Sequence, residues 1–210
     1  MSARPAAGGG RWVDVPPERL TRWLENFASR HGGHTVQGLV LTGTDGATAE
    51  LFPPPGLPPV TDLADLHEQA AAPRRIGLLL ARKGAVAAGV AHGRKLLSSK
   101  VDTHYVQGRT AAGGWSQQRF ARRRDNQAKA AAADAVGIAA RILLPEARSL
   151  SALVTGGDRT AVDTVLAAPQ LAALAALRHD RFLDVPEPRR TVLEEAVDQA
   201  RAVRILVRDP

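Results

Sequence analysis

Residues Ile76–Arg82 (Ile-Gly-Leu-Leu-Leu-Ala-Arg) and Ala85–His92 (Ala-Val-Ala-Ala-Gly-Val-Ala-His) form two nearly continuous apolar runs, separated only by Lys83-Gly84. Such runs, bounded by a turn, are typical of strands that are buried on both faces of a sheet. Lys95–Val106 follows after another short connection and reads as a third strand. Consecutive strands with short connections favour an antiparallel meander.

Downstream of the meander, helices and strands alternate. The 3.6-residue periodicity and the turn signals predict the following elements: a helix over Gln117–Leu144, a strand at Leu153–Thr155, a helix through about Leu166, a helix over Leu171–Leu177, a strand at Phe182–Val185 and a helix over Thr191–Val203. This order predicts an α/β fold with a mixed sheet, and it resembles a ribonuclease-H-like layout. We expect this domain to occupy residues 60–210.

Upstream of the meander, the chain predicts a small helix-plus-hairpin unit over residues 11–59. Pro16-Pro17-Glu18 opens a helix that ends at Gly32-Gly33, and Asp45-Gly46 joins a strand over Thr35–Thr42 to one over Ala47–Phe52. Pro53–Pro59 is too rich in proline for regular structure and predicts a stiff connector. Residues 1–10 are expected to form a disordered tail.

The composition indicates an ordinary globular chain with a basic surface. Of the 210 residues, 44% are hydrophobic and 23% are charged, and the net charge is +7, which favours a polyanionic partner. Cysteine is absent, so disulfides, thiolate catalysis and cysteine-ligated zinc are excluded. No secretory or membrane-spanning pattern is visible, and we expect a cytoplasmic protein.

A glycine pair followed by a glutamine pair is the clearest motif. It comes before the predicted long helix and reads Gly113-Gly114-Trp115-Ser116-Gln117-Gln118-Arg119-Phe120, and Arg122, Arg123 and Arg124 follow. Glycine lets a loop enter a narrow space, and glutamine is an uncharged donor and acceptor. Arginines are unfavourable at the positive end of a helix dipole, which indicates an external phosphate there. This combination predicts a loop that probes RNA.

Other chemistries fit the sequence less well. Ser116 lacks the Gly-x-Ser-x-Gly context of a nucleophile, and no Gly-Lys-Ser/Thr follows the glycines to form a phosphate-binding P-loop. A two-metal nuclease needs carboxylates on the first strands, where Asp102 is the one acid between residues 76 and 106. The histidines show no zinc spacing, and His31 with His34 fits a polar cap at a helix end better. We therefore expect neither a metal nor a cofactor.

The motif resembles that of a known family. Gly114-Trp115-Ser116-Gln117, preceded by Gly113 and leading into a basic helix, is similar to the Vms-like release-factor family, in its high-GC bacterial branch. The family is related to the middle domain of eukaryotic and archaeal class I release factors. The similarity covers Arg109–Gln127 as a motif and about Ile76–Arg208 as a layout. The absence of cysteine departs from the zinc finger of the eukaryotic members.

The resemblance implies a metal-independent peptidyl-tRNA hydrolase in ribosome rescue or quality control. Its partners would be the ribosomal large subunit, peptidyl-tRNA and ribosomal RNA, with neither membrane nor DNA involved. Gln117 would position water or the ribose hydroxyl at the ester, with Gln118 as the alternative one residue along. The residues expected to bind RNA are Arg119, Arg122, Arg123, Arg124, Arg109 and Trp115, with Lys95 and Lys100 as further candidates.

Two other interpretations stay open from the sequence. The chain could be a non-catalytic RNA-binding or ribosome-associated factor, in which only the basic surface functions and the glutamines are incidental. A nuclease is the third reading. The sequence does not define the stalled substrate, the recruiting partner, the oligomeric state or the role of the N-terminal unit.

Overall fold

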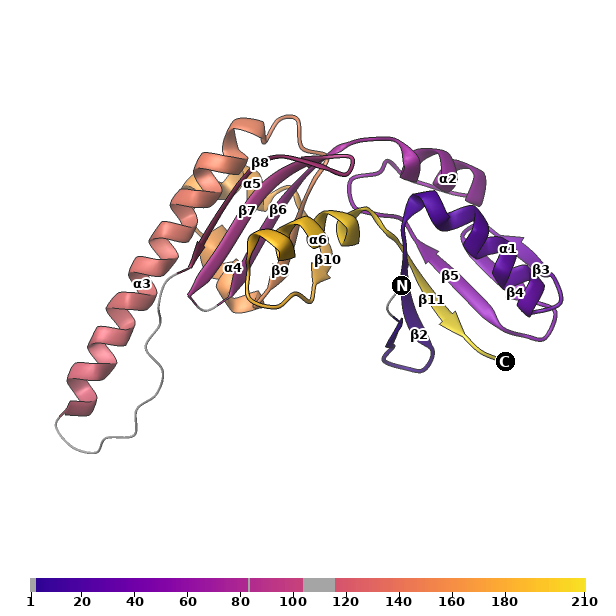
Figure 1. The fold of residues 1–210 in the computed structure, drawn as a ribbon, viewed down its shortest axis with the longest axis horizontal. Helices are drawn as coiled ribbons and strands as arrows, with labels where there is room; N and C mark the ends of the chain where they lie inside the picture. The colour runs from indigo at the N-terminus through magenta and orange to yellow at the C-terminus, as the bar shows by residue number, and fades with distance from the viewer. Residues whose placement is uncertain (1–2, 83, 104–115) are drawn as a thin grey trace. The chain divides into compact units, whose positions relative to one another are not determined.

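The computed structural model describes residues 3–82, 84–103 and 116–210 (Figure 1). The chain divides into two compact units, one built from residues 1–74 and 198–210 and the other from residues 75–197. The first unit therefore takes in both ends of the chain. This division differs from the boundary expected between residues 59 and 60, because the last residues of the chain complete the N-terminal sheet.

The first unit contains a six-stranded sheet in the order β1-β2-β11-β5-β4-β3, with every neighbouring pair antiparallel. Its strands are β1 (Ala3–Pro5), β2 (Arg11–Val15), β3 (His34–Gln37), β4 (Val40–Gly43), β5 (Thr48–Phe52) and β11 (Val203–Arg208). Its helical segments are η1 (Pro17–Arg19), α1 (Leu20–Arg30) and α2 (Leu63–Ala71). Both α1 and α2 contribute buried side chains to the core of the unit.

Only one face of this sheet carries the core. Along β2 and β5 buried residues alternate with partly exposed ones, and Val13, Leu51 and Ile205 pack with Leu20 and Phe27 of α1. On the opposite face, the ring centroid of Trp12 lies 5.3 Å from that of Phe52 in an edge-on contact. This alternation is the pattern of an antiparallel sheet with one packed face.

The second unit contains a five-stranded mixed sheet in the order β10-β9-β6-β7-β8. The β6-β7-β8 part is an antiparallel meander, as predicted, and β9 and β10 extend it in parallel from β6. The strands are β6 (Arg75–Arg82), β7 (Ala85–His92), β8 (Lys95–Thr103), β9 (Ala152–Gly157) and β10 (Arg178–Leu183). The helical segments are α3 (Ser116–Leu143), η2 (Leu144–Glu146), α4 (Arg159–Leu166), η3 (Pro169–Leu171), α5 (Ala172–Ala175) and α6 (Arg190–Arg201).

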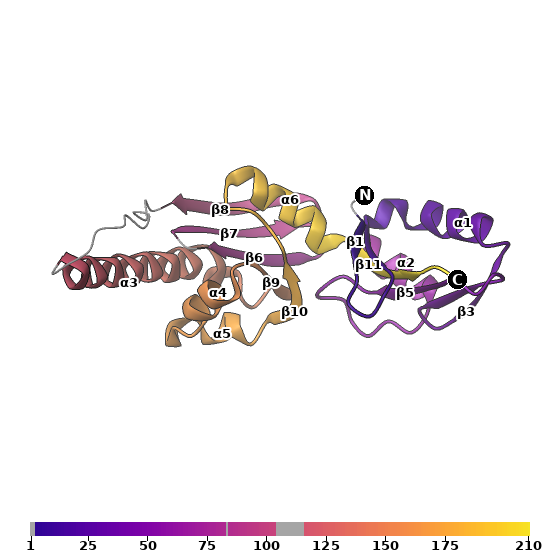
Figure 2. The ribbon, with the colours of Figure 1, turned by 90° about the horizontal axis from the view of Figure 1, so that it is seen from below.

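Helices cover both faces of the second sheet. Figure 2 shows α6 on one side of β6 and β7, and α3, α4 and α5 on the other. Gly89 of β7 makes room for Leu193 of α6, because a Cβ at that position would lie 3.1 Å from a Leu193 methyl carbon. Gly77 of β6 makes similar room on the opposite face, where Leu150 and Leu143 approach. Burial from both sides explains why β6 and β7 are continuous apolar runs.

Several expectations require correction. Residues 3–5 are not part of a disordered tail but form β1, which pairs with β2 across a turn containing Gly8, Gly9 and Gly10 at positive φ. The expected strand over residues 35–42 is two strands, because Gly38 at φ 60° turns β3 into β4. Strand β11 was not expected at all, and β10 begins at Arg178 rather than at Phe182.

Candidate functional site

The glycine-glutamine motif follows β8 in the chain and continues into the first turn of α3. Arg109, Gly113, Gly114 and Trp115 fall outside the described residues, whereas Ser116 is the first residue of α3. Gln117, Gln118 and Arg119 therefore belong to the first turn of that helix, and residues 122–124 to the second. The structure describes the backbone of these positions but not their side chains.

The helical backbone distinguishes the two glutamine positions. Successive residues of an α-helix point about 100° apart, so positions 117 and 118 cannot face the same direction. Positions 122 and 123 follow position 119 by three and four residues and so flank it on one side of α3, whereas position 124 lies outside this side. A single anionic partner at the start of α3 would therefore meet a row of three arginine positions.

The second half of α3 anchors the helix in the core. Ala135, Ile138, Ala139 and Leu143 are buried, and they belong to the same cluster as Val90 of β7. Towards residue 116 the helix extends beyond the edge of the sheet, as Figure 1 shows. The stretch from 116 to 131 is about 22 Å long at 1.5 Å per residue. Within the described chain, no helix, α3 included, is long and apolar enough to cross a membrane.

Alanine favours the extension of α3 beyond the sheet. Residues 130–133 are all alanine, the residue with the highest intrinsic helix propensity, so this part of the helix needs little packing to form. The arrangement holds the start of α3 away from the core on a helix that is fixed at its other end. Such a geometry suits a loop that must reach into a separate molecule.

The two lysines proposed as further RNA contacts are exposed on β8. Lys95 is its first residue, and Lys100 lies five positions further along. At about 3.3 Å per residue the two are separated by roughly 16 Å along the strand. They cannot grip the same phosphate.

The acidic side chains that the structure describes in the second unit do not form a metal site. Asp158 caps α4, since its carboxylate accepts a hydrogen bond of 2.9 Å from the Ala161 N–H. Asp102 and Asp134 each interact with other groups. Across residues 3–82, 84–103 and 116–210, no group of three or more His, Asp or Glu side chains has a geometry that could hold a metal ion.

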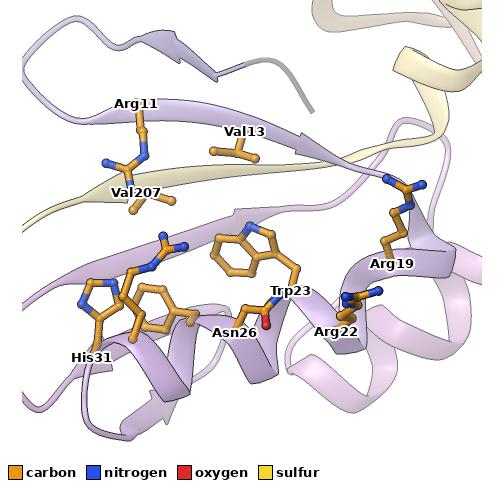
Figure 3. Close-up of a pocket in the computed structure, with 10 residues that line it drawn as sticks. Arg11, Val13, Arg19, Arg22, Trp23, Asn26, His31 and Val207 are labelled. Atoms are coloured by element: carbon orange, nitrogen blue, oxygen red, sulfur yellow. The ribbon is translucent and has the colours of Figure 1, made fainter.

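The first unit contains a hollow that the sequence did not predict, with a volume of about 590 Å³. It lies between α1 and the strands β2 and β11, and Figure 3 shows Trp23 in its middle. We call it the α1 pocket. Its lining residues are Arg11, Val13, Arg19, Arg22, Trp23, Asn26, Phe27, Arg30, His31 and Val207. Four are arginines, and no carboxylate is among these lining residues.

A histidine at the end of α1 connects this pocket to the β4-β5 turn. His31 is the C-cap residue of α1 and is 6% exposed. Its Nδ1 lies 2.8 Å from Oδ2 of Asp45. This hydrogen bond, together with one from the Ala47 N–H, lowers the pKa of the Asp45 carboxyl below its usual value of 3.8. His31 thus occupies the C-cap position of α1, but its side chain pairs with Asp45 of the β4-β5 turn instead of capping the helix backbone.

Sequence reasoning missed the α1 pocket although a signal was there. Arg19, Trp23 and Phe27 are spaced four residues apart, and Arg22 and Asn26 are spaced in the same way, which places all five on one helical side. Three of the five are polar, so the stripe is not that of a helix which buries one apolar face completely. The part of the pocket that is lined by strands could not be predicted from the sequence, because β11 comes from the far end of the chain.

Residues 74–206, which contain the α/β unit with its meander and its extended helix, match a release-factor family. Residues 74–206 match the family described as the Actinobacteria/chloroflexi VLRF1 release factor, and the chain belongs to this family. The matched region includes the whole glycine-glutamine segment and α3. No curated protein matches the chain.

Two solved structures are also similar. One is the crystal structure of an archaeal translation termination factor, aRF1, with 16% identity and a TM-score of 0.47, covering 90% of this chain and 63% of that one. The other, described as an archaeal protein, has 16% identity and a TM-score of 0.39, covering 90% of this chain and 65% of that one. The chain thus spans less than two thirds of the length of either structure.

Proposed function

We propose that this protein hydrolyses peptidyl-tRNA on stalled ribosomes or large subunits, without reading a codon. The observation that carries the proposal is the family match over residues 74–206, because it contains the Gly-x-x-Gln motif together with the helix that follows it. Because α3 extends beyond the sheet, its first turn could enter a partner molecule, and this geometry supports the proposal. The order of the sheet, with a meander extended by two parallel strands, supports the ribonuclease-H-like layout.

The reaction is hydrolysis of the ester between the nascent peptide and the terminal ribose. Water attacks the ester carbonyl carbon, the negative charge gathers on the carbonyl oxygen, and the ribose oxygen leaves with a proton. Glutamine has no titrating group and cannot act as a general base, but Gln117 can orient the water or the ribose hydroxyl. Gly113 and Gly114 would let the loop backbone approach the tRNA end.

The arginines at the start of α3 would dock the loop on RNA. Without a partner, cations at this end of a helix are disfavoured by typically 0.3–1 kcal/mol each. Phosphates of tRNA or ribosomal RNA would reverse that effect by occupying the same end. Surrounding RNA would also exclude bulk water from the ester, which strengthens the stabilisation of the oxyanion.

The deciding experiment is single-turnover release of peptide from purified ribosomes that carry peptidyl-tRNA. Gln117→Ala should slow release by orders of magnitude while ribosome affinity stays within a few fold. Gln170→Ala is a matched control, because Gln170 is an exposed glutamine of the same unit, remote from the motif in sequence. Loss of activity in Gln118→Ala instead would shift the register by one residue and keep the reaction class.

The same assay separates the alternatives. A non-catalytic ribosome-binding factor would bind ribosomes but release no peptide with either wild-type or variant protein. A nuclease would remove nucleotides from the tRNA, whereas ester hydrolysis leaves the terminal adenosine intact. Analysis of the tRNA end on a sequencing gel therefore accompanies the measurement of peptide.

A further inference from the structure

The charged side chains that line the α1 pocket are all arginines. Arg19, Arg22 and Arg30 line it and are exposed. Among the residues that the structure describes, none of the three makes a hydrogen bond or an ion pair with a side chain. Arg11 differs, since its Nη1 pairs with the Asp209 carboxylate. Three unpaired cations around one hollow leave a positive potential that an anion would neutralise.

The wall of the pocket also contains an orphaned polar atom. His31 is buried, its Nδ1 is held by Asp45, and its Nε2 has no hydrogen-bond partner in the described structure. A buried polar atom without a partner is uncommon in a folded protein and requires an explanation. Figure 3 places His31 and Arg11 towards one end of the hollow and Arg19 and Arg22 towards the other.

An aromatic surface lies between the charges. Trp23 stacks on Phe27, with ring centroids 5.7 Å apart and an angle of 18° between the planes. This stacking holds the half-buried indole in place in the middle of the pocket. An ordered aromatic ring flanked by arginines is the combination that single-stranded nucleic acid requires, with phosphates on the guanidinium groups and a base on the ring.

We infer that the α1 pocket binds a segment of single-stranded RNA, a second RNA contact that is separate from the glycine-glutamine loop. From Arg19 to Arg30 the arginines extend about 16 Å along the helix, which is enough for more than one phosphate. The anionic nature of the ligand follows from the pocket itself. The choice of RNA over an acidic peptide rests on the proposed function.

The test measures binding of a fluorescein-labelled ten-residue oligouridine to the full chain by anisotropy, over a series of salt concentrations. The variant Arg19→Gln/Arg22→Gln/Arg30→Gln removes the three unpaired charges. Its control, Arg141→Gln/Arg148→Gln/Arg208→Gln, removes three charges from arginines that are also exposed and unpaired among the described residues but do not line the pocket. Both are repeated with Arg122, Arg123 and Arg124 replaced by Gln, which separates the pocket from the start of α3.

The pocket variant should bind oligouridine at least about tenfold more weakly at low salt, and its log-log salt slope should fall by about 0.7 per lost phosphate contact. The control should change both values less. Equal losses in the two variants, or undiminished binding by the pocket variant with an unchanged melting temperature, would overturn the inference. So would a polyglutamate peptide that binds through these arginines while oligouridine does not.

A second variant keeps the charges and tests the ring. Trp23→Leu preserves an apolar side chain on α1 but removes the stacking surface, and it should weaken oligouridine binding without changing the salt slope. Unchanged binding by a folded Trp23→Leu protein would remove the base-stacking part of the inference. Because these readouts contain no peptide release, failure of the hydrolase proposal would appear separately, as absent release with RNA binding intact.

Discussion

The two sheets of this protein expose their surfaces in opposite ways. In the second unit, helices cover both faces of β6 and β7, and the described part of the motif, from Ser116 on, forms the start of α3 beyond the edge of the sheet. In the first unit one face is packed, and a hollow lined by arginines remains where α1 meets β2 and β11. The comparison teaches that a fully buried sheet serves as an anchor for a projecting element, whereas a partly covered sheet can form a binding surface itself.

The largest expected effect tests whether the second sheet is the anchor. Leu79 of β6 is fully buried, and Leu79→Ala should lower the free energy of unfolding by about 2–5 kcal/mol through lost transfer energy and a cavity. Leu97→Ala on the edge strand β8, where the side chain is 46% exposed, should cost less than about 0.5 kcal/mol. Urea denaturation measures both. Similar losses would contradict the idea that the face covered by α3 dominates stability.

A second test compares the same type of helix cap in the two units. Asp62 caps α2 by accepting from the Asp65 N–H, and Asp158 caps α4 by accepting from the Ala161 N–H, each at 2.9 Å. Replacing either Asp by Ala should cost about 1 kcal/mol, because one N–H at the helix start loses its partner. Thermal unfolding checks the losses. A cap that costs nothing would indicate that its helix contributes little to the stability of its unit.

A third change sharpens the account of α3. Gly137 lies in the middle of the helix, is exposed, and has nothing within 4 Å of the position that a Cβ would occupy. Gly137→Ala should therefore stabilise the protein by about 0.5–1 kcal/mol, since alanine loses less conformational entropy in a helix. A higher unfolding midpoint is the expected observation. Destabilisation would show that α3 needs a bend at this residue.

The smallest expected effect is a pH dependence in the second unit. Burial lowers the pKa of His179 below 6.5, nearby Arg181 lowers it further, and Asp180 opposes them; Nδ1 of His179 accepts a hydrogen bond from the Arg181 N–H. The folded protein thus favours the neutral ring. Stability from this group is complete above pH 6.5 and is lost as the pH falls through the folded pKa. His179→Gln should reduce the loss between pH 8 and 5.5, and an unchanged profile would contradict this role.

The sequence predicted the second unit better than the first, for a physical reason. The doubly buried strands β6 and β7 leave continuous apolar runs, and the length of α3 is visible in its periodicity. Arg11–Val15 mixes charged and apolar residues without strict alternation and lies beside a glycine-rich turn, so its strand character depends on pairing with β11. Such pairing is not local and leaves no local signal.

The two candidate sites also differ in how far they could be predicted from the sequence. The glycine-glutamine motif is contiguous, so its residues could be found by reading the chain, although their side-chain arrangement is not described. The α1 pocket combines Arg11 and Val207, which oppose each other in the β2-β11 ladder but come from the two ends of the chain. Only the fold brings them together with α1.

The position of β11 has a consequence for biosynthesis. This strand lies in the interior of the first sheet, between β2 and β5, and contributes the buried side chains of Val203, Ile205 and Val207, yet it is translated after every other element described. Residues 75–197 can therefore fold before β11, the strand that pairs with both β2 and β5, has been synthesised. Until β11 arrives, each presents an unpaired edge, the feature that promotes aggregation between chains. Translation that stops short of Val203 would leave the nascent protein in this vulnerable state.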